Sequence, residues 1–203
     1  MYKSIRLFGI AALLTLLSSP FNDADAVGRV KARGATANAQ GGVTGGSASA
    51  VRGPNGGAAV RGRGYTTDGQ GNGQAASGGA VRTPAGGYGA RGGSTTWNAD
   101  GSAQHQSGAA AQGPNGSAQT SGGFTRDSAG NVSGGRSTSA QGAAGGSLNS
   151  QTGYSTGQGF GRSTSASGQQ GSVNAQTQVT QDGRTVTRTC TDASGNVVPC
   201  PQW

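Results

Sequence analysis

Large aliphatic side chains are almost absent from this chain after residue 26. The last 177 of its 203 residues contain no Ile, no Met, one Leu, two Phe and twelve Val. Leu, Ile, Val and Phe together are therefore 15 of 177 residues, below the roughly 20% at which globular folding becomes doubtful. Burying one such side chain stabilises a fold by roughly 1.5–3 kcal/mol, against about 1–2 kcal/mol of backbone entropy for each ordered residue. A conventional hydrophobic core is therefore excluded.

Residues suited to catalysis or metal binding are equally scarce. The chain has no Glu, one His and, after residue 26, five Asp, each within a sequence typical of turns. His105 has no evident partners for a catalytic triad. Two cysteines and one histidine make a weak metal site. We therefore expect no enzyme, no metal, no cofactor and no small-molecule substrate.

Long apolar runs are limited to one, near the N-terminus. Residues 1–26 fit a secretory signal, with Lys3 and Arg6 before the apolar run Leu7–Leu17 and a small-residue cleavage site at Ala24–Ala26. Eleven mostly apolar residues are too few to cross a bilayer core, which needs about 20. We expect a protein that is secreted, at the cell surface or periplasmic, with no transmembrane segment after cleavage.

Glycine, by contrast, is abundant and recurs about every fifteen residues. Turn sequences such as Pro54-Asn55-Gly56 accompany it, since Pro presets φ and Gly accepts the positive φ that follows. About ten residues rich in Gly and Thr separate the turns, which predicts a strand in each repeat. The recurring glycines, each expected at a turn, are Gly41, Gly56, Gly71, Gly86, Gly101, Gly116, Gly130, Gly146 and Gly161.

The architecture of the repeats stays open at this level, because the chain is either all-β or largely disordered. A second glycine cluster within the repeat, such as Gly78-Gly79, is either a kink in one long strand or a second turn. The first option is a meander and the second a β-solenoid. Arg61 and Arg91 are separated by two periods, as are Val51 and Val81, which favours the meander. In composition the repeats resemble silk-like and bacterial surface-fibre repeats, which implies close stacking of sheets and self-association.

The composition changes again near Gly168. Val173–Thr180 alternates as a strand does, and Asp182-Gly183 supplies a two-residue hairpin turn. A hairpin closed by that turn places Val179 opposite Val186. A further turn at 194–195 sets the two cysteines opposite each other.

The two cysteines, Cys190 and Cys200, are expected to form a disulfide in an exported protein. The sequence therefore predicts four parts. These are a signal peptide at 1–26, a basic segment at 27–40, Gly-rich repeats at 41–167 and a disulfide-closed hairpin cap at 168–203.

Positive charge is the remaining chemical signal. After residue 26 the chain has thirteen Lys and Arg against five Asp, a net charge of +8, and residues 27–97 hold eight of the thirteen. The Arg-Gly pairs resemble the Arg-Gly segments of RNA-binding proteins, but export favours lipopolysaccharide, acidic polysaccharide or extracellular DNA as the anionic partner. The expected contacts to such a polymer are Arg52, Arg61, Arg63, Arg82 and Arg91.

These observations predict a secreted structural or interaction protein of the cell surface or extracellular matrix, whose basic first half contacts anionic polymers. One alternative is an ice-binding β-solenoid. Thr and Ser runs such as Ser94–Thr96 favour it, although they do not recur at one fixed position of the repeat. Another alternative is a disordered, cationic, exported spacer.

Overall fold

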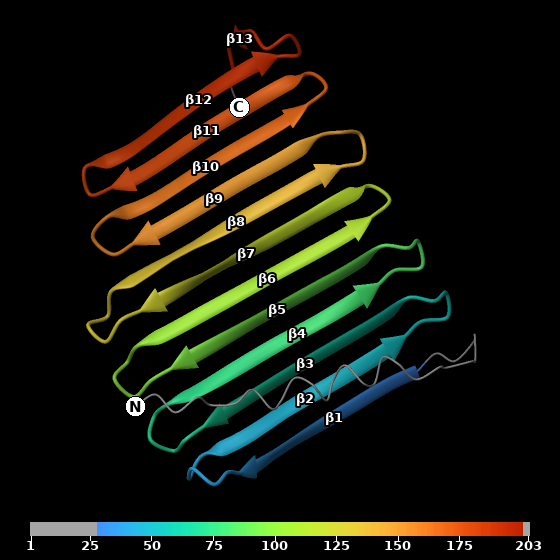
Figure 1. Ribbon diagram of the computed structural model, residues 1–203, viewed down its shortest axis with the longest axis vertical. Helices are drawn as coiled ribbons and strands as arrows, with labels where there is room; N and C mark the ends of the chain where they lie inside the picture. The colour runs from blue at the N-terminus through green and yellow to red at the C-terminus, as the bar shows by residue number, and fades with distance from the viewer. Residues whose placement is uncertain (1–27, 201–203) are drawn as a thin grey trace.

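The computed structural model describes residues 28–200, which form thirteen strands and no helix. Each strand pairs antiparallel with its neighbours in the chain, so that the expected all-β fold is confirmed as one open meander, not a solenoid (Figure 1). No described segment is a helix with the length and apolarity that crossing a membrane requires. The strands are β1 (Gly28–Ala37), β2 (Val43–Arg52), β3 (Ala58–Thr67), β4 (Gly73–Arg82), β5 (Tyr88–Trp97), β6 (Ala103–Gly113), β7 (Gly116–Arg126), β8 (Val132–Gly142), β9 (Ser147–Ser155), β10 (Gly159–Gly168), β11 (Gly171–Thr180), β12 (Gly183–Asp192) and β13 (Val197–Val198).

The expected signal peptide at 1–26 lies outside the described residues. Most of the expected basic segment at 27–40 forms β1, which is an edge strand of the sheet. Charged side chains on an edge strand oppose edge-to-edge pairing with another sheet. Arg29, Lys31 and Arg33 therefore protect this edge.

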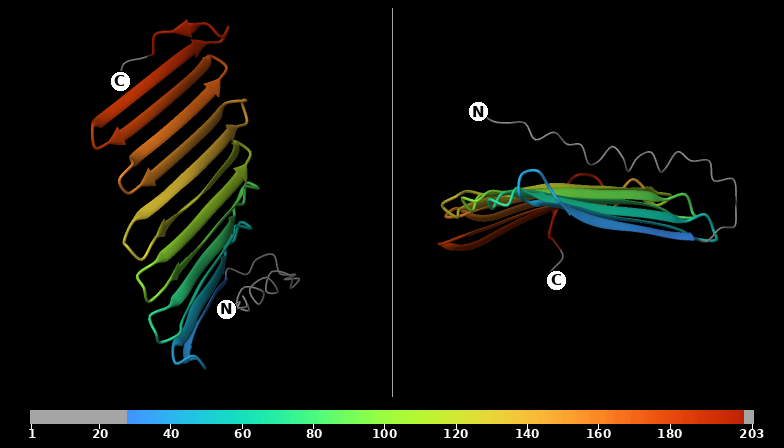
Figure 2. Two further views of the ribbon diagram at one scale, coloured as in Figure 1. Left: turned by 60° about the vertical axis from the view of Figure 1, so that its left-hand side comes forward. Right: turned by 90° about the horizontal axis from the view of Figure 1, so that it is seen from below.

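The sheet is a single layer, and no described segment covers either of its faces (Figure 2). Cys190, 4% exposed, is the one buried hydrophobic side chain in residues 28–200. Backbone contacts between the described strands join sequence neighbours only. The fold is therefore held by ladder hydrogen bonds and by cross-strand side-chain pairs, each of which contributes about 0.2–1 kcal/mol.

The turns of the regular repeats share one geometry. At Asn38–Gly42, the N–H of Asn38 donates to the carbonyl of Gly42 at 2.9 Å, and the N–H of Gly41 donates to the carbonyl of Asn38 at 3.1 Å. Gly41 has a φ of 80°. This is the three-residue hairpin loop in which a type I turn precedes a left-handed residue. The extended residues 42–53 and the three loop residues after them make one fifteen-residue period.

The structure places most of the recurring glycines at turns, but not all of them. Gly116 begins β7, Gly146 follows the left-handed Gly145, and Gly161 lies inside β10, where Gly157 supplies the positive φ of the preceding turn. The glycine clusters within the repeats lie inside strands. Those in turn loops with φ between 78° and 96° are Gly41, Gly56, Gly71, Gly86, Gly101 and Gly130.

The C-terminal hairpin has a different register from the one expected. Gly183 begins β12, so that Gln181 and Asp182 form the loop, and Val179 lies opposite Arg184 instead of Val186. The N–H of Asp182 donates to the hydroxyl of Thr180 at 3.3 Å, which stabilises this earlier loop. A shift of two residues keeps every side chain on its expected face.

The expected disulfide is present. Cys190 is bonded to Cys200, with 5.3 Å between the Cα atoms, although the residue opposite Cys190 in the ladder is Val198. The segment expected as a cap continues the sheet, because β11 pairs with β10 from Gly171 to Val179.

Several turns begin with an Asp whose carboxylate accepts backbone N–H groups of the same turn. Asp68 Oδ1 accepts from Gln70 and Asn72 at 2.8 and 3.0 Å. A hydrogen bond from the Asn72 side chain is the largest cause that lowers the pKa of Asp68. The Asn131 side chain lowers the pKa of Asp127 in the same way. The ionised carboxylates therefore stabilise these turns.

We expect the thermal midpoint of the sheet to stay constant from pH 7 to about 5 and to fall by several degrees between about pH 4 and 2. The pKa of each of Asp68, Asp100, Asp127 and Asp192 is lower in the folded chain. The stabilisation from these carboxylates is therefore complete above the unfolded pKa of about 3.9 and is lost as the pH falls through the folded pKa. In D68N/D127N the fall is smaller, because Asn does not titrate and, as Asn38 shows, accepts the same N–H groups. Circular dichroism melts at each pH measure this, and an equal fall in both proteins would contradict it.

Candidate binding face

The ladder register sorts the charged side chains onto two faces. Paired residues share a face, and successive residues alternate between faces. Of the thirteen Lys and Arg after residue 26, eleven lie on one face, which we call the basic face; only Arg52 and Arg82 lie on the other. The eleven are Arg29, Lys31, Arg33, Arg61, Arg63, Arg91, Arg126, Arg136, Arg162, Arg184 and Arg188.

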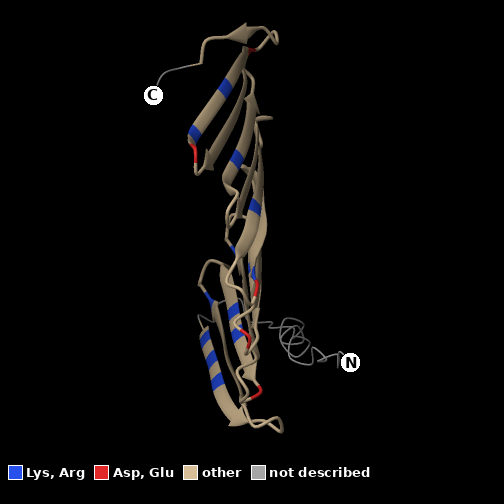
Figure 3. Ribbon diagram, turned by 90° about the vertical axis from the view of Figure 1, so that its left-hand side faces the viewer, with Lys and Arg blue, Asp and Glu red and all other residues tan. Residues whose placement is uncertain are grey.

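Acidic residues lie away from the middle of the sheet. Four of the five Asp after residue 26 are in turns, and Asp192 is the last residue of β12. Figure 3 shows the cations along the strands and the carboxylates at the strand ends. The field over the basic face is therefore positive.

Five of the six basic-face cations in the first five strands form two rows that run across the sheet. Lys31, Arg61 and Arg91 share one row, on β1, β3 and β5. Arg33 and Arg63 share the next row, on β1 and β3. Two strands correspond to thirty residues, so a separation of thirty in sequence brings side chains into one row.

Serines on the intervening strand orient two of these arginines. Arg61 donates from Nε to Ser49 Oγ at 3.1 Å, and Arg63 donates from Nε to Ser47 Oγ at 3.2 Å. Because the serines accept from Nε, these two hydrogen bonds leave the terminal nitrogens of both guanidinium groups unused. These terminal nitrogens form the fork that binds carboxylates and phosphates.

The two rows line a groove of about 1050 Å³ that extends from β1 to β8. Lys31, Arg33, Arg61, Arg63, Arg91 and Arg136 all contribute to its walls. At the β8 end, Arg136 donates to Thr120 Oγ1 at 3.1 Å and to Ser107 Oγ at 3.2 Å. Its guanidinium group thus reaches across β7 to β6.

An aromatic row borders the groove on the same face. Tyr65, His105, Phe124, Tyr154 and Phe160 lie in this row. His105 Nδ1 is 2.8 Å from the hydroxyl oxygen of Thr95, and the His105 and Phe124 rings stack with centroids 5.5 Å apart. The rim of the groove is therefore built from rings with defined positions.

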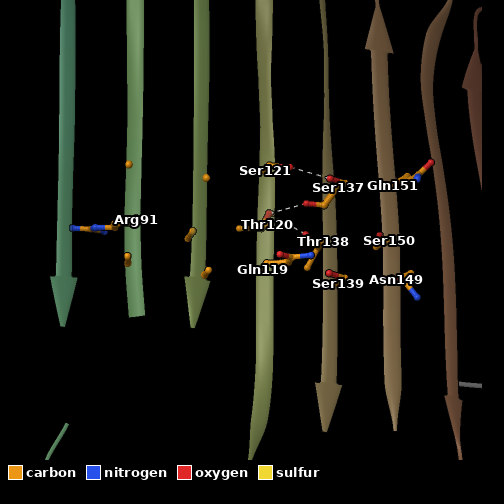
Figure 4. A pocket seen from close by; sticks show the side chains of 15 residues that line it. Arg91, Gln119, Thr120, Ser121, Ser137, Thr138, Ser139, Asn149, Ser150 and Gln151 are labelled. Carbon is orange, nitrogen blue, oxygen red and sulfur yellow. Dashed lines mark hydrogen bonds between the residues drawn. The ribbon is translucent and has the colours of Figure 1, made fainter. Parts of the chain in front are cut away.

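A second hollow of about 490 Å³ lies over β5 to β9 (Figure 4), and most of its lining side chains belong to the opposite face of the sheet. Arg91 lies at one side of it, and hydroxyl and amide side chains of β7, β8 and β9 lie at the other. Thr120 and Thr138 are hydrogen-bonded at 3.1 Å, as are Ser121 and Ser137. The Thr120–Thr138 pair lies on the basic face and the Ser121–Ser137 pair on the opposite face, so the opposite face has a hollow of its own, lined by neutral polar side chains.

The opposite face, which we call the small-residue face, has little charge. Its middle row over the first six strands contains only Ala and Gly, from Ala32 to Gly108. A row near one end of the strands contains threonines. These include Thr36, Thr44, Thr66, Thr96 and Thr125, with Gln74 and Gln104 between them.

The structure brings together three of the five arginines expected to contact a polymer. Arg61, Arg63 and Arg91 lie in the groove, whereas Arg52 and Arg82 lie on the small-residue face. Sequence reasoning missed Lys31, Arg33 and Arg136. The thirty-residue separations of Lys31 and Arg33 from Arg61 and Arg63 were the available signal for the first two.

Chemically, the groove suits anions. No group of three or more His, Cys, Asp or Glu residues that would hold a metal ion occurs within residues 28–200. Six cations with neutral hydroxyls between them attract a polymer of negative charge through Coulomb forces and charge-assisted hydrogen bonds. Comparison with protein-family models, curated proteins and solved structures gives no match for this chain.

Proposed function

We propose that this protein is an exported structural or interaction protein of the cell surface or extracellular matrix, and that its basic face binds anionic polymers. The observation that carries the proposal is the segregation of eleven of thirteen cations onto one face. If the positive charge served only solubility, the cations could be distributed over both faces. A single-layer sheet also offers an unusually large surface for its length, which suits adhesion.

Acidic polysaccharide, lipopolysaccharide and extracellular DNA are the polymers that an exported protein of this charge would meet. The edge strand β1 carries three cations, which favours a role for the faces over growth by edge pairing. Self-association would use the small-residue face, where Ala and Gly allow close approach of a second sheet.

We expect R61Q/R91Q to weaken binding to anionic polymers about fivefold to thirtyfold. Each exposed ion pair contributes up to about 1 kcal/mol, and the variant removes two from the groove. R52Q/R82Q removes the same charge from the small-residue face and is the matched control, with an expected change below about twofold. Binding of the chain from Val27 to each immobilised polymer at increasing salt measures this, since exposed charges are screened by salt.

Equal weakening in the two variants would mean that net charge, and not the basic face, drives binding. Absence of binding to every anionic polymer would exclude the proposal as a whole.

A second candidate function is ice binding by the small-residue face. The threonine row on that face favours it, with Thr44 Oγ1 and Thr66 Oγ1 2.8 Å apart on adjacent strands. Gln74 and Gln104 interrupt the row. Ice crystals grown with the protein separate the two functions: faceted crystals would support ice binding, and unshaped discs would exclude it.

A further inference from the structure

The cations of the groove are spaced at regular, wide intervals. Lys31, Arg61 and Arg91 lie in one row on β1, β3 and β5, with the neutral Ser49 and Gly79 between them. Neighbouring strands lie about 4.8 Å apart, so successive cations of this row are about 9.6 Å apart. A ligand that follows the row therefore meets a positive charge at every second strand.

The groove is also narrow. The row that contains Arg33 and Arg63 lies two residues further along the strands, about 6.6 Å away. This distance admits one extended chain between the two rows. Hydroxyl groups of Ser47 and Ser77 lie in the second row between or beside its cations.

A flat aromatic ring borders the cations. Added to Gly45, a Cβ atom would lie 2.8–2.9 Å from the hydroxyl oxygen, Cε1 and Cζ of Tyr65, so this ring lies against the β2 backbone. Its other surface is open, since Tyr65 is 44% exposed. Tyr65 is two residues from Arg63 on β3 and therefore shares its face. The open ring surface suits stacking against the apolar side of a sugar ring.

We propose that the groove holds one extended chain of an acidic polysaccharide in which a carboxylate-bearing sugar alternates with a neutral sugar. This inference rests on the function proposed above and specifies its ligand. The chain crosses the strands, with carboxylates over Lys31, Arg61 and Arg91 and neutral sugars over Ser49 and Gly79. A hexose in an extended chain is about as long as the distance between strands, so one disaccharide matches two strands.

DNA fits the row less well. Each strand of a duplex carries a phosphate about every 3.4 Å along the axis, roughly three times as densely as this row carries cations. Most phosphates would lie over Ser, Gly or Ala and remain unpaired. A polymer with one negative charge per two strands would leave no negative group unpaired.

The test compares ligands on the chain from Val27 at about 0.15 M salt. The probes are hyaluronan fragments, which alternate glucuronate with N-acetylglucosamine, the same fragments with reduced carboxyl groups, and single-stranded and duplex DNA of matching length. We expect hyaluronan to bind at least tenfold more tightly than its reduced form and at least fivefold more tightly than either DNA. Tyr65→Ala weakens hyaluronan binding about fivefold, Tyr65→Phe keeps it, and Tyr88→Ala, on the opposite face, changes it less than twofold.

The outcomes separate this inference from the proposed function. DNA binding as tight as hyaluronan binding, with the same loss in R61Q/R91Q, would overturn the polysaccharide and leave a general polyanion groove. Equal weakening by Tyr65→Ala and Tyr88→Ala would remove the role of the flat ring and overturn the proposed binding mode. Failure to bind any of the charged polymers would exclude the proposed function itself.

Discussion

We expect a chain that lacks two strands, residues 103–131, to bind anionic polymers within about threefold of the intact chain, and a chain that lacks one strand, residues 73–87, to bind at least tenfold more weakly. The larger deletion is thus the harmless one. Both deletions remove whole strands together with whole turns, so each is expected to leave an open sheet. The difference lies in the face on which the later side chains are placed.

Deletion of 103–131 removes β6 and β7 and joins the turn after β5 to β8. Trp97 then lies opposite Val132, as it previously lay opposite Ala103, and Arg91 lies opposite Thr138. All of these residues keep their rows, because Ala103 and Val132 already share one row through Arg126. The six groove cations remain on the basic face. His105 is lost, which accounts for the small weakening.

Deletion of 73–87 removes β4 and joins the turn after β3 to β5. Gly73 is replaced by Tyr88 as the partner of Thr67, and Arg91 then lies opposite Gly64. Gly64 lies on the small-residue face, so Arg91 and every later side chain change face. The variant keeps Lys31, Arg33, Arg61 and Arg63 on the basic face, but Arg91 and Arg136, and every later cation, move to the small-residue face.

Binding to an immobilised acidic polysaccharide measures both variants, and circular dichroism checks that each retains a β spectrum. Since the backbone of each described strand contacts only its sequence neighbours, removal of strands leaves no distant backbone contact unsatisfied. Tight binding by the one-strand deletion would mean that the face of the cations does not matter, which would contradict the proposed function.

The fifteen-residue period was predictable because its cause is local. Pro54-Asn55-Gly56 specifies the loop, and a glycine at the third loop position has the positive φ that the type I turn requires next. The strands follow from what lies between such loops. The turns and the strands between them could therefore be derived from spacing and turn chemistry, whereas the choice of a meander over a solenoid or a disordered chain stayed open.

The faces of the sheet were not predictable from the same signals. Arg52 and Arg82 are separated by thirty residues, as are Arg61 and Arg91, and the sequence offered both pairs as one group. Their separation onto opposite faces depends on the three-residue loop, which pairs Gly53 with Gly57 and so Arg52 with Ala58. A loop one residue shorter would reverse the relation between neighbouring strands. The length of the loops is therefore the information needed to assign each arginine to a face.

The C-terminal hairpin shows the same limit. Asp182-Gly183 is a strong two-residue turn signal, yet the loop lies one residue earlier, at Gln181 and Asp182, where the hydroxyl of Thr180 accepts an N–H. A side-chain hydrogen bond of this kind competes with backbone propensity. The predicted disulfide between Cys190 and Cys200 is confirmed despite this error, because a disulfide requires the two residues to be close and not directly opposite each other in the ladder.

We expect Gly123→Val to destabilise the sheet by on the order of 3 kcal/mol, a large effect among single substitutions. Added to Gly123 in β7, a Cβ atom would overlap the carbonyl oxygen of His105 and lie 3.1 Å from its carbonyl carbon. The obstacle is the backbone of β6, which a rotamer change cannot remove. The two strands must therefore separate at this point, and ladder hydrogen bonds between them are lost.

The matched control for this substitution is Gly161→Val in β10. Gly161 lies in the same row and on the same face as Gly123, but a Cβ atom there would meet nothing within 4 Å. Glycine inside a strand costs about 0.5–1 kcal/mol, and β-branched residues favour the extended backbone. We therefore expect Gly161→Val to leave the sheet as stable as before or slightly more stable.

Thermal melts followed by circular dichroism distinguish the two variants. One kcal/mol corresponds to about 2–4 °C for a domain of this size, so Gly123→Val lowers the midpoint by about 6–12 °C. Because the backbones of β6 and β8 are not in contact and the hydrogen bond from Arg136 to Ser107 Oγ is a side-chain link across β7, the loss at Gly123 also weakens the coupling between the strands before it and those after it. The melt is therefore expected to broaden or to split into two steps. A single sharp transition at the original temperature would show that β6 and β7 can separate locally without cost, and that the close backbone approach at Gly123 does not support the sheet.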